Sequence, residues 1–589
     1  MKILFRLICI AASSLVVNNA SASDGVNGAD ESPPLTAPPI IINLNELGIR
    51  PIVIDQCKPY LIIGTEGTFY NKSISVETTC KVILTLENVW LKPEGQAPLD
   101  VGMNVKLLLI GHNVLTGSDN NPGIKVNQDA FLYINQAEDN TDSITVTGGK
   151  NAAGIGGSNG KSSGTVTIGG GNITAQGGEA AAGIGGGNGG SNGSINIDGG
   201  TVSATGGTWG AGIGGGRRVK DGGGNGGNLI INGGVITAKG GQYASGIGAG
   251  EGGTCGKIEI IDGTITAEGN FNAAGIGNST NTKNPIGNCL ITIQGGNVTA
   301  LAGKNGGAGI GAGKNGALVT INGGTVNAIG AYGAGIGGGA DENGGTVTIN
   351  GGHVIAHGGE GGGPVYHGSA GIGGGPNSGG NAGNITITGG IVEASGGSSG
   401  SAGGGGAGIG GGYAGTGANT MITGGTVNAF GGFNAAGIGG GERGHGGWVT
   451  IKGGTITAIG GGVGPYSGAG IGGGSQTGFF QGGCGAQVTI AGGSIKAVRG
   501  GPDAEDIGHG RILICDSGSL KNSLGQQVSK RVLTDAINPT NPLPVTLSIP
   551  ISGPAGSYNY QYAGSGHVEY GRPDPNLYFY LPSNAPVTP

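Results

Sequence analysis

One stretch decides how this chain folds: Thr346-Val347-Thr348-Ile349-Asn350-Gly351-Gly352-His353-Val354-Ile355-Ala356. With a period of two residues, Val347 and Ile349 point to one side and Thr348 points to the other, as in a β-strand. After the double glycine, Val354 and Ala356 take the inward positions. The stretch therefore predicts two short strands joined by a glycine turn.

A second short motif recurs along the chain and marks each repeat. It is Gly-Ile-Gly, usually preceded by Ala or Ala-Gly, and we call its central residue the marker isoleucine. The marker isoleucines are Ile155, Ile184, Ile213, Ile247, Ile276, Ile310, Ile336, Ile372, Ile409, Ile438, Ile471 and Ile507, spaced 26 to 37 residues apart. The last copy, Asp506-Ile507-Gly508-His509, is degenerate, as expected where an array ends. Each repeat thus contains three short strands, and no run of helix-forming residues is long enough for a helix.

Each of the three strands in a repeat has apolar side chains on its inward face, and a single repeat cannot bury these side chains by itself. Stacked repeats bury them by placing Ile on Ile and Val on Val at about 4.8 Å per coil. The sequence therefore predicts an all-β fold, a parallel β-helix of about fourteen coils and about 70 Å of stack. Glycine suits the corners because it adopts positive φ at little cost.

The flanking segments differ from the repeats. Residues 40–143 contain fewer glycines but keep a similar spacing of apolar residues. Asn88-Val89-Trp90-Leu91 is similar to the later segment Asn113-Val114-Leu115-Thr116, and Pro98-Leu99-Asp100-Val101 is similar to the later segment Pro122-Gly123-Ile124-Lys125-Val126. We expect N-terminal capping coils at 40–143, glycine-rich coils at 144–515 and a small C-terminal β module at 516–589 that covers the end of the stack. Residues 23–39 read as a flexible leader.

The N-terminus has the features of a secretory signal peptide, predicted at residues 1–22. Lys2 and Arg6 precede an apolar run from Leu7 to Val17, and Ala20-Ser21-Ala22 supplies small residues for cleavage. The run is shorter than the 20 or so apolar residues of a membrane helix, and no later stretch resembles one. We therefore expect a secreted or cell-surface protein without a membrane span.

Composition excludes several classes of protein. The chain has 146 glycines in 589 residues, without the three-residue period of collagen. A net charge of −6 argues against a nucleic-acid partner, which requires a basic face. Six cysteines follow the signal segment, and an even number in an exported chain permits disulfides. Their spacing suggests the pairs Cys57–Cys80 and Cys255–Cys289, whereas the remaining two, Cys484 and Cys515, would lie at opposite ends of aligned strands.

The repeat resembles a family, the secreted bacterial glycine-rich β-helix proteins of the carbohydrate-binding-domain type. The resemblance rests on Gly424-Gly425-Thr426-Val427-Asn428-Ala429 followed by Ala436-Gly437-Ile438-Gly439-Gly440-Gly441. The opening Val82-Ile83-Leu84-Thr85-Leu86 and the ending Leu577-Tyr578-Phe579-Tyr580-Leu581-Pro582 are also similar to that family. The resemblance implies a right-handed β-helix at the cell surface or in the medium, with polysaccharide binding or adhesion as its function.

Aromatic residues often precede the marker motif in a chain that has only 4% aromatics. They lie four to six residues ahead of the marker isoleucine and should line one edge of the stack: Trp209, Tyr243, Phe271, Tyr332, Tyr366, Phe433 and Tyr466. Such rings can stack on sugar faces. The alternative is that they cover one another or a glycine corner.

Three further patterns have a structural and a functional interpretation. An outward threonine recurs in the first strand (Thr167, Thr292, Thr320, Thr348, Thr386, Thr450 and Thr489) and either meets a planar polysaccharide or ice, or serves as an ordinary strand residue. Asn or Asp before the double glycine (Asp198, Asn232, Asn322 and Asn350) predicts a side-chain ladder at the turn.

Glu138, Asp139 and Asp142 are weak calcium candidates in an oxygen-rich loop, where a solvated turn is the alternative. His353, His357, Glu360 and His367 are too far apart along the chain to predict a metal site.

The function expected from the sequence is binding of a polysaccharide or a host or cell-surface glycan, or adhesion, without catalysis. No catalytic residues, metal or other cofactor are predicted apart from the weak calcium site. The acidic residues occupy different repeat positions, whereas β-helix polysaccharide lyases and glycoside hydrolases need clustered acids. Such an enzyme remains an alternative, and a structural element of the envelope or matrix is another.

Overall fold

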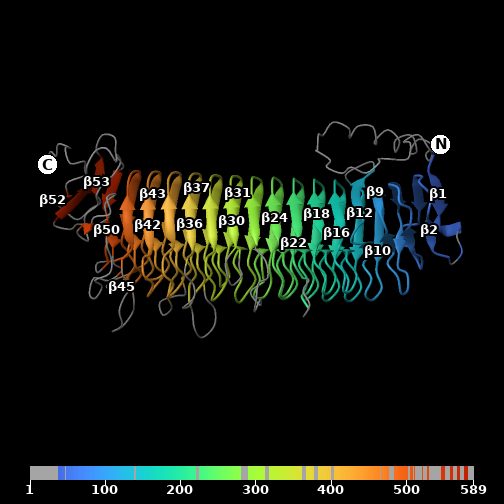
Figure 1. Cartoon of the computed structure of the whole chain (residues 1–589), viewed down its shortest axis with the longest axis horizontal. Helices are drawn as coiled ribbons and strands as arrows, with labels where there is room; N and C mark the ends of the chain where they lie inside the picture. Colours follow the sequence, from blue (N-terminus) through green and yellow to red (C-terminus); the bar gives the residue numbers. More distant parts are fainter. Residues whose placement is uncertain are drawn as a thin grey trace. The chain divides into compact units, whose positions relative to one another are not determined.

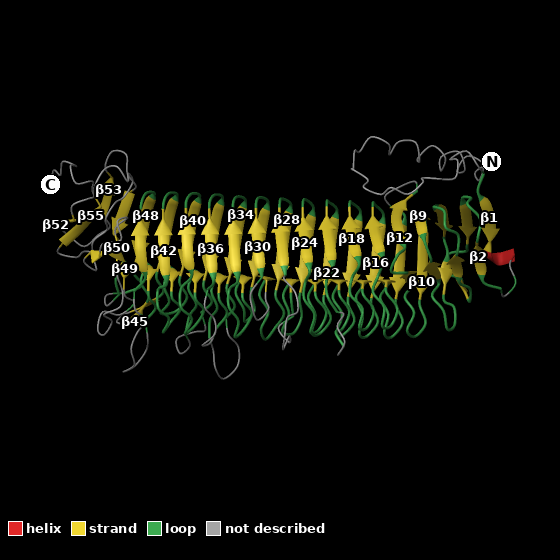
Figure 2. Ribbon diagram, viewed as in Figure 1, coloured by secondary structure: helices red, strands yellow, loops and turns green. Residues whose placement is uncertain are grey.

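The structure, a computed structural model, describes residues 38–510 and the C-terminal strands at 520–521, 527–528, 546–550, 558–561, 567–570 and 576–580. Within 38–510 it leaves out residues 47, 49, 138–140, 220–223, 280–288, 312–316, 361–366, 377–381, 399–403, 464–465, 476–482, 484, 502–503 and 509. The chain divides into two compact units, Met1–Ile265 (unit 1) and Thr266–Pro589 (unit 2). Each unit consists of coils that pass in turn through three parallel sheets (Figures 1 and 2).

Unit 1 contains these strands. The first sheet has β1 (Ile40–Asn43), β3 (Tyr60–Ile63), β6 (Val82–Glu87), β9 (Asn104–Ile110), β12 (Phe131–Gln136), β15 (Thr165–Ile168), β18 (Ser194–Ile197), β21 (Asn228–Ile231) and β24 (Lys257–Ile260). The second has β2 (Ile52–Ile54), β5 (Ile74–Val76), β8 (Leu99–Val101), β11 (Ile124–Val126), β14 (Ile155–Gly156), β17 (Ile184–Gly185), β20 (Ile213–Gly214) and β23 (Ile247–Gly248). The third has β4 (Phe69–Tyr70), β7 (Trp90–Leu91), β10 (His112–Thr116), β13 (Ser143–Thr147), β16 (Asn172–Gln176), β19 (Thr201–Thr205) and β22 (Val235–Lys239), and β25 (Thr264–Glu268) lies at the boundary of the units.

Unit 2 repeats the pattern. The first sheet has β27 (Leu290–Ile293), β30 (Leu318–Ile321), β33 (Thr346–Ile349), β36 (Asn384–Ile387), β39 (Asn419–Ile422), β42 (Trp448–Ile451) and β47 (Gln487–Ile490). The second has β26 (Ile276–Gly277), β29 (Ile310–Gly311), β32 (Ile336–Gly337), β35 (Ile372–Gly373), β38 (Ile409–Gly410), β41 (Ile438–Gly439), β46 (Ile471–Gly472) and β49 (Ile507–Gly508). The third has β28 (Asn297–Leu301), β31 (Thr325–Ile329), β34 (His353–His357), β37 (Ile391–Ser395), β40 (Thr426–Phe430), β43 (Thr455–Ile459) and β48 (Ser494–Val498), while β44 (Gly462–Val463) and β45 (Tyr466–Ser467) form a small hairpin.

The interior of each unit is built from like side chains placed one above another. In unit 1 Ile155 pairs with Ile184, and Ile184 pairs with Ile213. Side chains at the marker positions are fully buried, apart from Ile507 at 6% exposure. The alternation read from residues 346–356 is also confirmed, because Val347, Ile349, Val354 and Ala356 are all fully buried and Thr348 faces outward. The protein is therefore an all-β, right-handed parallel β-helix.

The double glycine between the first and third sheets has a steric cause. Gly352 has a φ of +85°, and a Cβ on it would lie 2.6 Å from the carbonyl oxygen of Gly324 in the preceding coil. The turn thus needs a residue without a side chain as well as one that accepts positive φ.

The first coils of unit 1 are bulkier, as the sequence predicts, and Leu84 and Leu107 fill the interior there. Leu99 stacks on Ile124 as expected. The register proposed between residues 88–91 and 113–116 is wrong by one residue, because Leu91 pairs with Leu115 and Trp90 pairs with Val114. Asn88 has a φ of +54°, so the chain turns there and the buried leucines of the two strands superpose.

Each unit has eight second-sheet strands among its described residues. The total of 16 is slightly more than the roughly fourteen coils expected for the whole chain. Beyond residue 510 lie β50 (Leu520–Lys521), β51 (Gln527–Val528), β52 (Thr546–Pro550), β53 (Tyr558–Gln561), β54 (His567–Tyr570) and β55 (Asn576–Tyr580). Strand β54 pairs in parallel with β48, so β54 and its partner β53 extend the third sheet. Strands β53 and β54, and β52 and β55, form antiparallel pairs. The bounds of the C-terminal module stay a prediction.

One predicted disulfide is present. Cys57 and Cys80 are bonded, with their Cα atoms 5.8 Å apart. Cys255 and Cys289 are both buried and disulfide-bonded, and their pairing with each other stays a prediction. Cys484 and Cys515 lie outside the described residues, as do the predicted signal peptide and most of the leader. The only helix among the described residues is the short 3-10 helix η1 (Leu44–Glu46), so none found there could span a membrane.

Candidate functional site

The aromatic candidates lie where each coil passes from the third sheet to the second. We call these connections the marker corner; residues 206–212, between β19 and β20, are one example. Trp209, Tyr243, Phe271, Tyr332, Phe433 and Tyr466 lie at or beside such connections and are all partly exposed. Tyr366 lies outside the described residues. These six residues therefore lie on one type of corner, and their role in ligand stacking stays a prediction.

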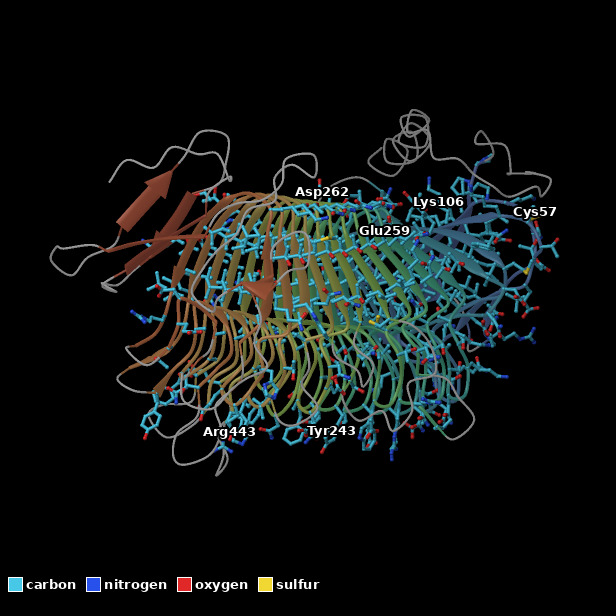
Figure 3. All side chains as sticks on the ribbon, turned by 60° about the vertical axis from the view of Figure 1, so that its left-hand side comes forward. Cys57, Lys106, Tyr243, Glu259, Asp262 and Arg443 are labelled. Atoms are coloured by element: carbon cyan, nitrogen blue, oxygen red, sulfur yellow. A yellow bond between two sulfur atoms is a disulfide. The ribbon has the colours of Figure 1, made fainter. Side chains whose placement is uncertain are left out.

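In unit 1, two of these rings occupy equivalent positions in neighbouring coils. Trp209 and Tyr243 each lie four residues before a marker isoleucine, and the two marker isoleucines, Ile213 and Ile247, pair directly. The backbone N–H of Tyr243 donates to the carbonyl of Thr208 at 3.1 Å, which holds the two corners together. Figure 3 shows Tyr243 at the edge formed by the loops, away from Glu259 on the first sheet.

A backbone ladder that the sequence did not predict joins successive corners. The residue four places after a marker isoleucine donates its N–H to the carbonyl four places before the marker of the preceding coil. The bonds include Arg217 to Ala180 (2.8 Å) and Glu251 to Trp209 (2.9 Å) in unit 1, and Tyr413 to Gly368 (2.9 Å), Glu442 to Gly405 (2.9 Å) and Ser475 to Asn434 (2.7 Å) in unit 2. This ladder brings the side chains that follow the marker motif beside the rings that precede it.

One ring is already covered by such a side chain. The guanidinium carbon of Arg217 lies 4.5 Å from the centre of the Trp209 ring. The Nε atom of Arg217 also lies 3.0 Å from a carboxylate oxygen of Glu251 in the next coil. Trp209 therefore meets solvent with one face occupied by a cation, an interaction worth about 0.5–1 kcal/mol at an exposed position.

A second ring cluster at the corner of unit 2 was missed from the sequence. Tyr413 lies 3.6 Å from the ring of His367 with an interplanar angle of 6°, and the guanidinium of Arg443 lies 5.2 Å from the Tyr413 ring. Burial is the main cause that raises the pKa of Tyr413; Glu442 raises it further and Arg443 opposes the shift. Tyr413 lies four residues after the marker Ile409, and Arg217 lies four residues after the marker Ile213, so the two residues share one repeat position. This shared position is the sequence signal that could have indicated the cluster.

A cavity of about 510 Å³ lies at the same type of corner in the first coils of unit 1. It is lined by Asn71, Lys92, Pro93, Glu94, Gly95, Gly117, Ser118 and Asp119. These residues follow three successive third-sheet strands, β4, β7 and β10. No repeat signal marks them, since they precede the first marker isoleucine, and the sequence did not predict this cavity.

The Asn and Asp residues at the turns and the outward threonines have partners in neighbouring coils. The turn residues form the predicted ladder, but they bond to one another rather than to the backbone: Asn232 to Asp198 at 2.6 Å, and Asn350 to Asn322 at 2.8 Å. In unit 2, Thr292, Thr320, Thr348 and Thr386 pair in register on the outer face of the first sheet. Met421 interrupts that row before Thr450 and Thr489.

Two of the residues considered for metal binding, Asp142 and His353, have partners within the protein. Asp142 is buried and accepts the backbone N–H of Gly111 at 2.8 Å, whereas Glu138 and Asp139 lie outside the described residues. His353 contacts Glu393 at 3.1 Å. Within the part of the chain that the structure describes, no three His, Cys, Asp or Glu side chains gather as a metal-binding group.

Comparison with known proteins bears on the fold. Nine segments match the model of a family described as beta helix repeat: residues 166–188, 195–217, 229–251, 258–280, 291–314, 319–340, 347–376, 421–442 and 449–475. Each segment begins in or near a first-sheet strand and reaches the following marker motif. No curated protein and no solved structure matches the chain. The repeat matches, together with the paired coils, support a β-helix protein family for this chain.

Proposed function

We propose that this protein is exported and binds polysaccharide along the marker corner without cleaving it, acting as a secreted or cell-surface adhesive protein. The observation that carries the proposal is the pair of partly exposed rings, Trp209 and Tyr243, at equivalent positions of adjacent coils. Rings bury apolar area against the flat face of a sugar while the sugar hydroxyls stay in water. A chain with repeated sugar units fits a surface that repeats at about 4.8 Å.

The charges of this corner support binding rather than hydrolysis. Lys150 lies 3.7 Å from Glu179, and Arg217 lies 3.0 Å from Glu251, so these acids face cations. Glycoside hydrolysis needs two carboxyl groups about 5–10 Å apart across the scissile bond, one of them able to give up a proton. Here Glu179 and Glu251 each lie beside a cation instead.

A glycan array tests the proposal directly. We expect the wild-type protein to bind at least one polysaccharide, and the double variant Trp209→Ala/Tyr243→Ala to lose that binding. Phe131→Ala is the matched control, since Phe131 is 49% exposed in the same unit but lies on the first sheet. Equal binding by the wild type and the double variant would exclude the corner, and release of products from pectin or alginate would identify a lyase or hydrolase instead.

A further inference from the structure

The cavity in the first coils has a simple structural origin. Three residues, 71–73, connect β4 to β5, whereas seven residues, 92–98, connect β7 to β8, and seven, 117–123, connect β10 to β11. Two long corner loops therefore stand beside a short one, and the space that a longer first loop would fill stays open.

The loops that line the cavity are held in place by hydrogen bonds between coils. The N–H of Glu94 donates to the Oδ1 atom of Asn71 at 3.1 Å, and the hydroxyl of Ser118 donates to the carbonyl of Gln96 at 3.0 Å. The side-chain amide of Asn121 donates to the carbonyl of Gly95 at 3.3 Å. These bonds use backbone groups, amides and a hydroxyl, so they fix the cavity walls without engaging its charged side chains.

Three charged side chains line the cavity: Lys92, Glu94 and Asp119. All three residues are exposed, and within the described residues none of their charged groups has an ion-pair or hydrogen-bond partner. One ammonium and two carboxylates give the cavity both donors and acceptors and a net charge of −1. That charge disfavours an acidic sugar, and the Lys92 ammonium disfavours a metal ion.

Sugar hydroxyls match this set of groups. A hydroxyl donates to a carboxylate and accepts from an ammonium, and hydrogen bonds to charged groups are stronger than those between neutral groups. The volume of about 510 Å³ falls within the range of small-ligand sites, which suits a short piece of a glycan rather than a long chain.

The position of the cavity connects it to the rings. Its loops lead into β8 and β11, and from β11 the second sheet continues through Ile155, Ile184 and Ile213 to Ile247. The cavity and the pair Trp209 and Tyr243 therefore belong to one corner of unit 1. We propose that the cavity lined by Asn71, Lys92, Glu94, Ser118 and Asp119 binds the end of an uncharged glycan whose length follows this corner. The inference rests on the proposed function and names its ligand class.

Calorimetry with neutral gluco-oligosaccharides and with oligogalacturonate tests this site. We expect the neutral sugars to bind the wild-type protein more tightly than oligogalacturonate does. Asp119→Asn and Lys92→Ala should each weaken binding of the neutral sugar about tenfold or more, because each removes a charge-assisted hydrogen bond. Asp129→Asn is the control, since Asp129 is also exposed but lies between β11 and β12, at a different corner.

The outcomes separate this inference from the proposed function. Polysaccharide binding that Trp209→Ala/Tyr243→Ala abolishes and that both cavity variants leave unchanged would overturn the cavity site alone. Tighter binding of oligogalacturonate than of the neutral sugars would overturn the ligand class. Failure of the wild-type protein to bind any polysaccharide would overturn the proposed function, and failure to bind any neutral oligosaccharide would overturn the cavity site.

Discussion

At the scale of single residues, the glycine that follows the marker isoleucine is constrained both by its backbone dihedral angle and by a neighbouring backbone. Gly214 has a φ of +139°, and a Cβ there would lie 1.9 Å from the carbonyl oxygen of Gly248 in the next coil. The interior therefore allows a close approach of two backbones that any side chain would prevent. The repetition of Gly-Ile-Gly in the sequence reflects this contact as much as the dihedral angle.

We predict that Gly214→Ala destabilises unit 1 by more than about 3 kcal/mol, since it adds a backbone clash to the strain of positive φ. Gly160→Ala is the control, because Gly160 also has positive φ (+73°) but has nothing within 4 Å of the added Cβ; it should cost only about 1–2 kcal/mol. Urea unfolding followed by circular dichroism measures both. Equal losses would show that φ alone, not the approach of the coils, requires glycine at Gly214.

A second residue-scale prediction concerns pH. Burial raises the pKa of Tyr413 above 10.0, so above pH 10 the folded protein keeps a proton that the unfolded chain releases. The stability contributed by this phenol is therefore complete below pH 10 and is lost as pH rises through the higher folded pKa. We expect Tyr413→Phe to lose less stability than the wild type between pH 8 and about pH 11. Identical pH dependence of the two urea midpoints would contradict this.

Inward and outward positions of single residues could be predicted almost completely, because period-two alternation follows from strand geometry alone. The partners of corner residues could not. The guanidinium of Arg217 reaches Trp209 of its own coil and Glu251 of the next, and this depends on how two loops of different coils lie together. Nothing in the local sequence encodes that arrangement.

At the scale of strands and loops, the first coils have the weakest support from neighbours, because an end coil stacks on one side only. The disulfide between Cys57 and Cys80 joins the turn after β2 to the turn after β5, and these two strands pair in register. It thus links consecutive coils at the beginning of unit 1.

We predict that Cys57→Ser/Cys80→Ser lowers the free energy of unfolding by about 3 kcal/mol, the chain-entropy value for a loop of this length. The sequence separation is 23 residues. The loss should appear as a lower urea midpoint of unit 1, with the circular-dichroism spectrum of the folded protein unchanged. Unfolding at the wild-type midpoint would show that the strand pairing of the first coils is sufficient without the covalent link.

The elements themselves could be predicted to different degrees. The Gly-Ile-Gly motifs predict the strands of the glycine-rich coils, whereas the sequence comparison aligns residues 88–91 with residues 113–116 one residue out of register. The reason is that Asn88 adopts positive φ and turns the chain, while a simple alignment assumes an uninterrupted strand. The corner cavity escaped prediction for a related reason, since it results from unequal loop lengths and not from any motif.

At the scale of the whole unit, the fold is a one-dimensional array in which each coil contacts its neighbours. Stability in such arrays is close to a sum of coil and interface contributions, and coils can be added or removed without changing the rest. Sequence repetition predicts this architecture well because the same side chains recur at the same positions. The proposed binding surface is poorly predicted, since it depends on the residues that break the repetition.

This additivity gives a prediction for unit 1. Deletion of residues 155–183 removes β14, β15 and β16 and places Ile184 directly after Gly154. Ile184 can then pair with Ile124 as Ile155 does now, so the shortened chain should fold with a β-rich circular-dichroism spectrum and a modestly lower urea midpoint. Deletion of residues 155–168 is the matched control, because it removes β14 and β15 but keeps β16, so the strands that follow fall out of step with the sheets. We expect that protein to aggregate or stay unfolded, since its apolar stripes cannot superpose. If both deletions fold equally well, the stacking of like side chains does not determine the structure.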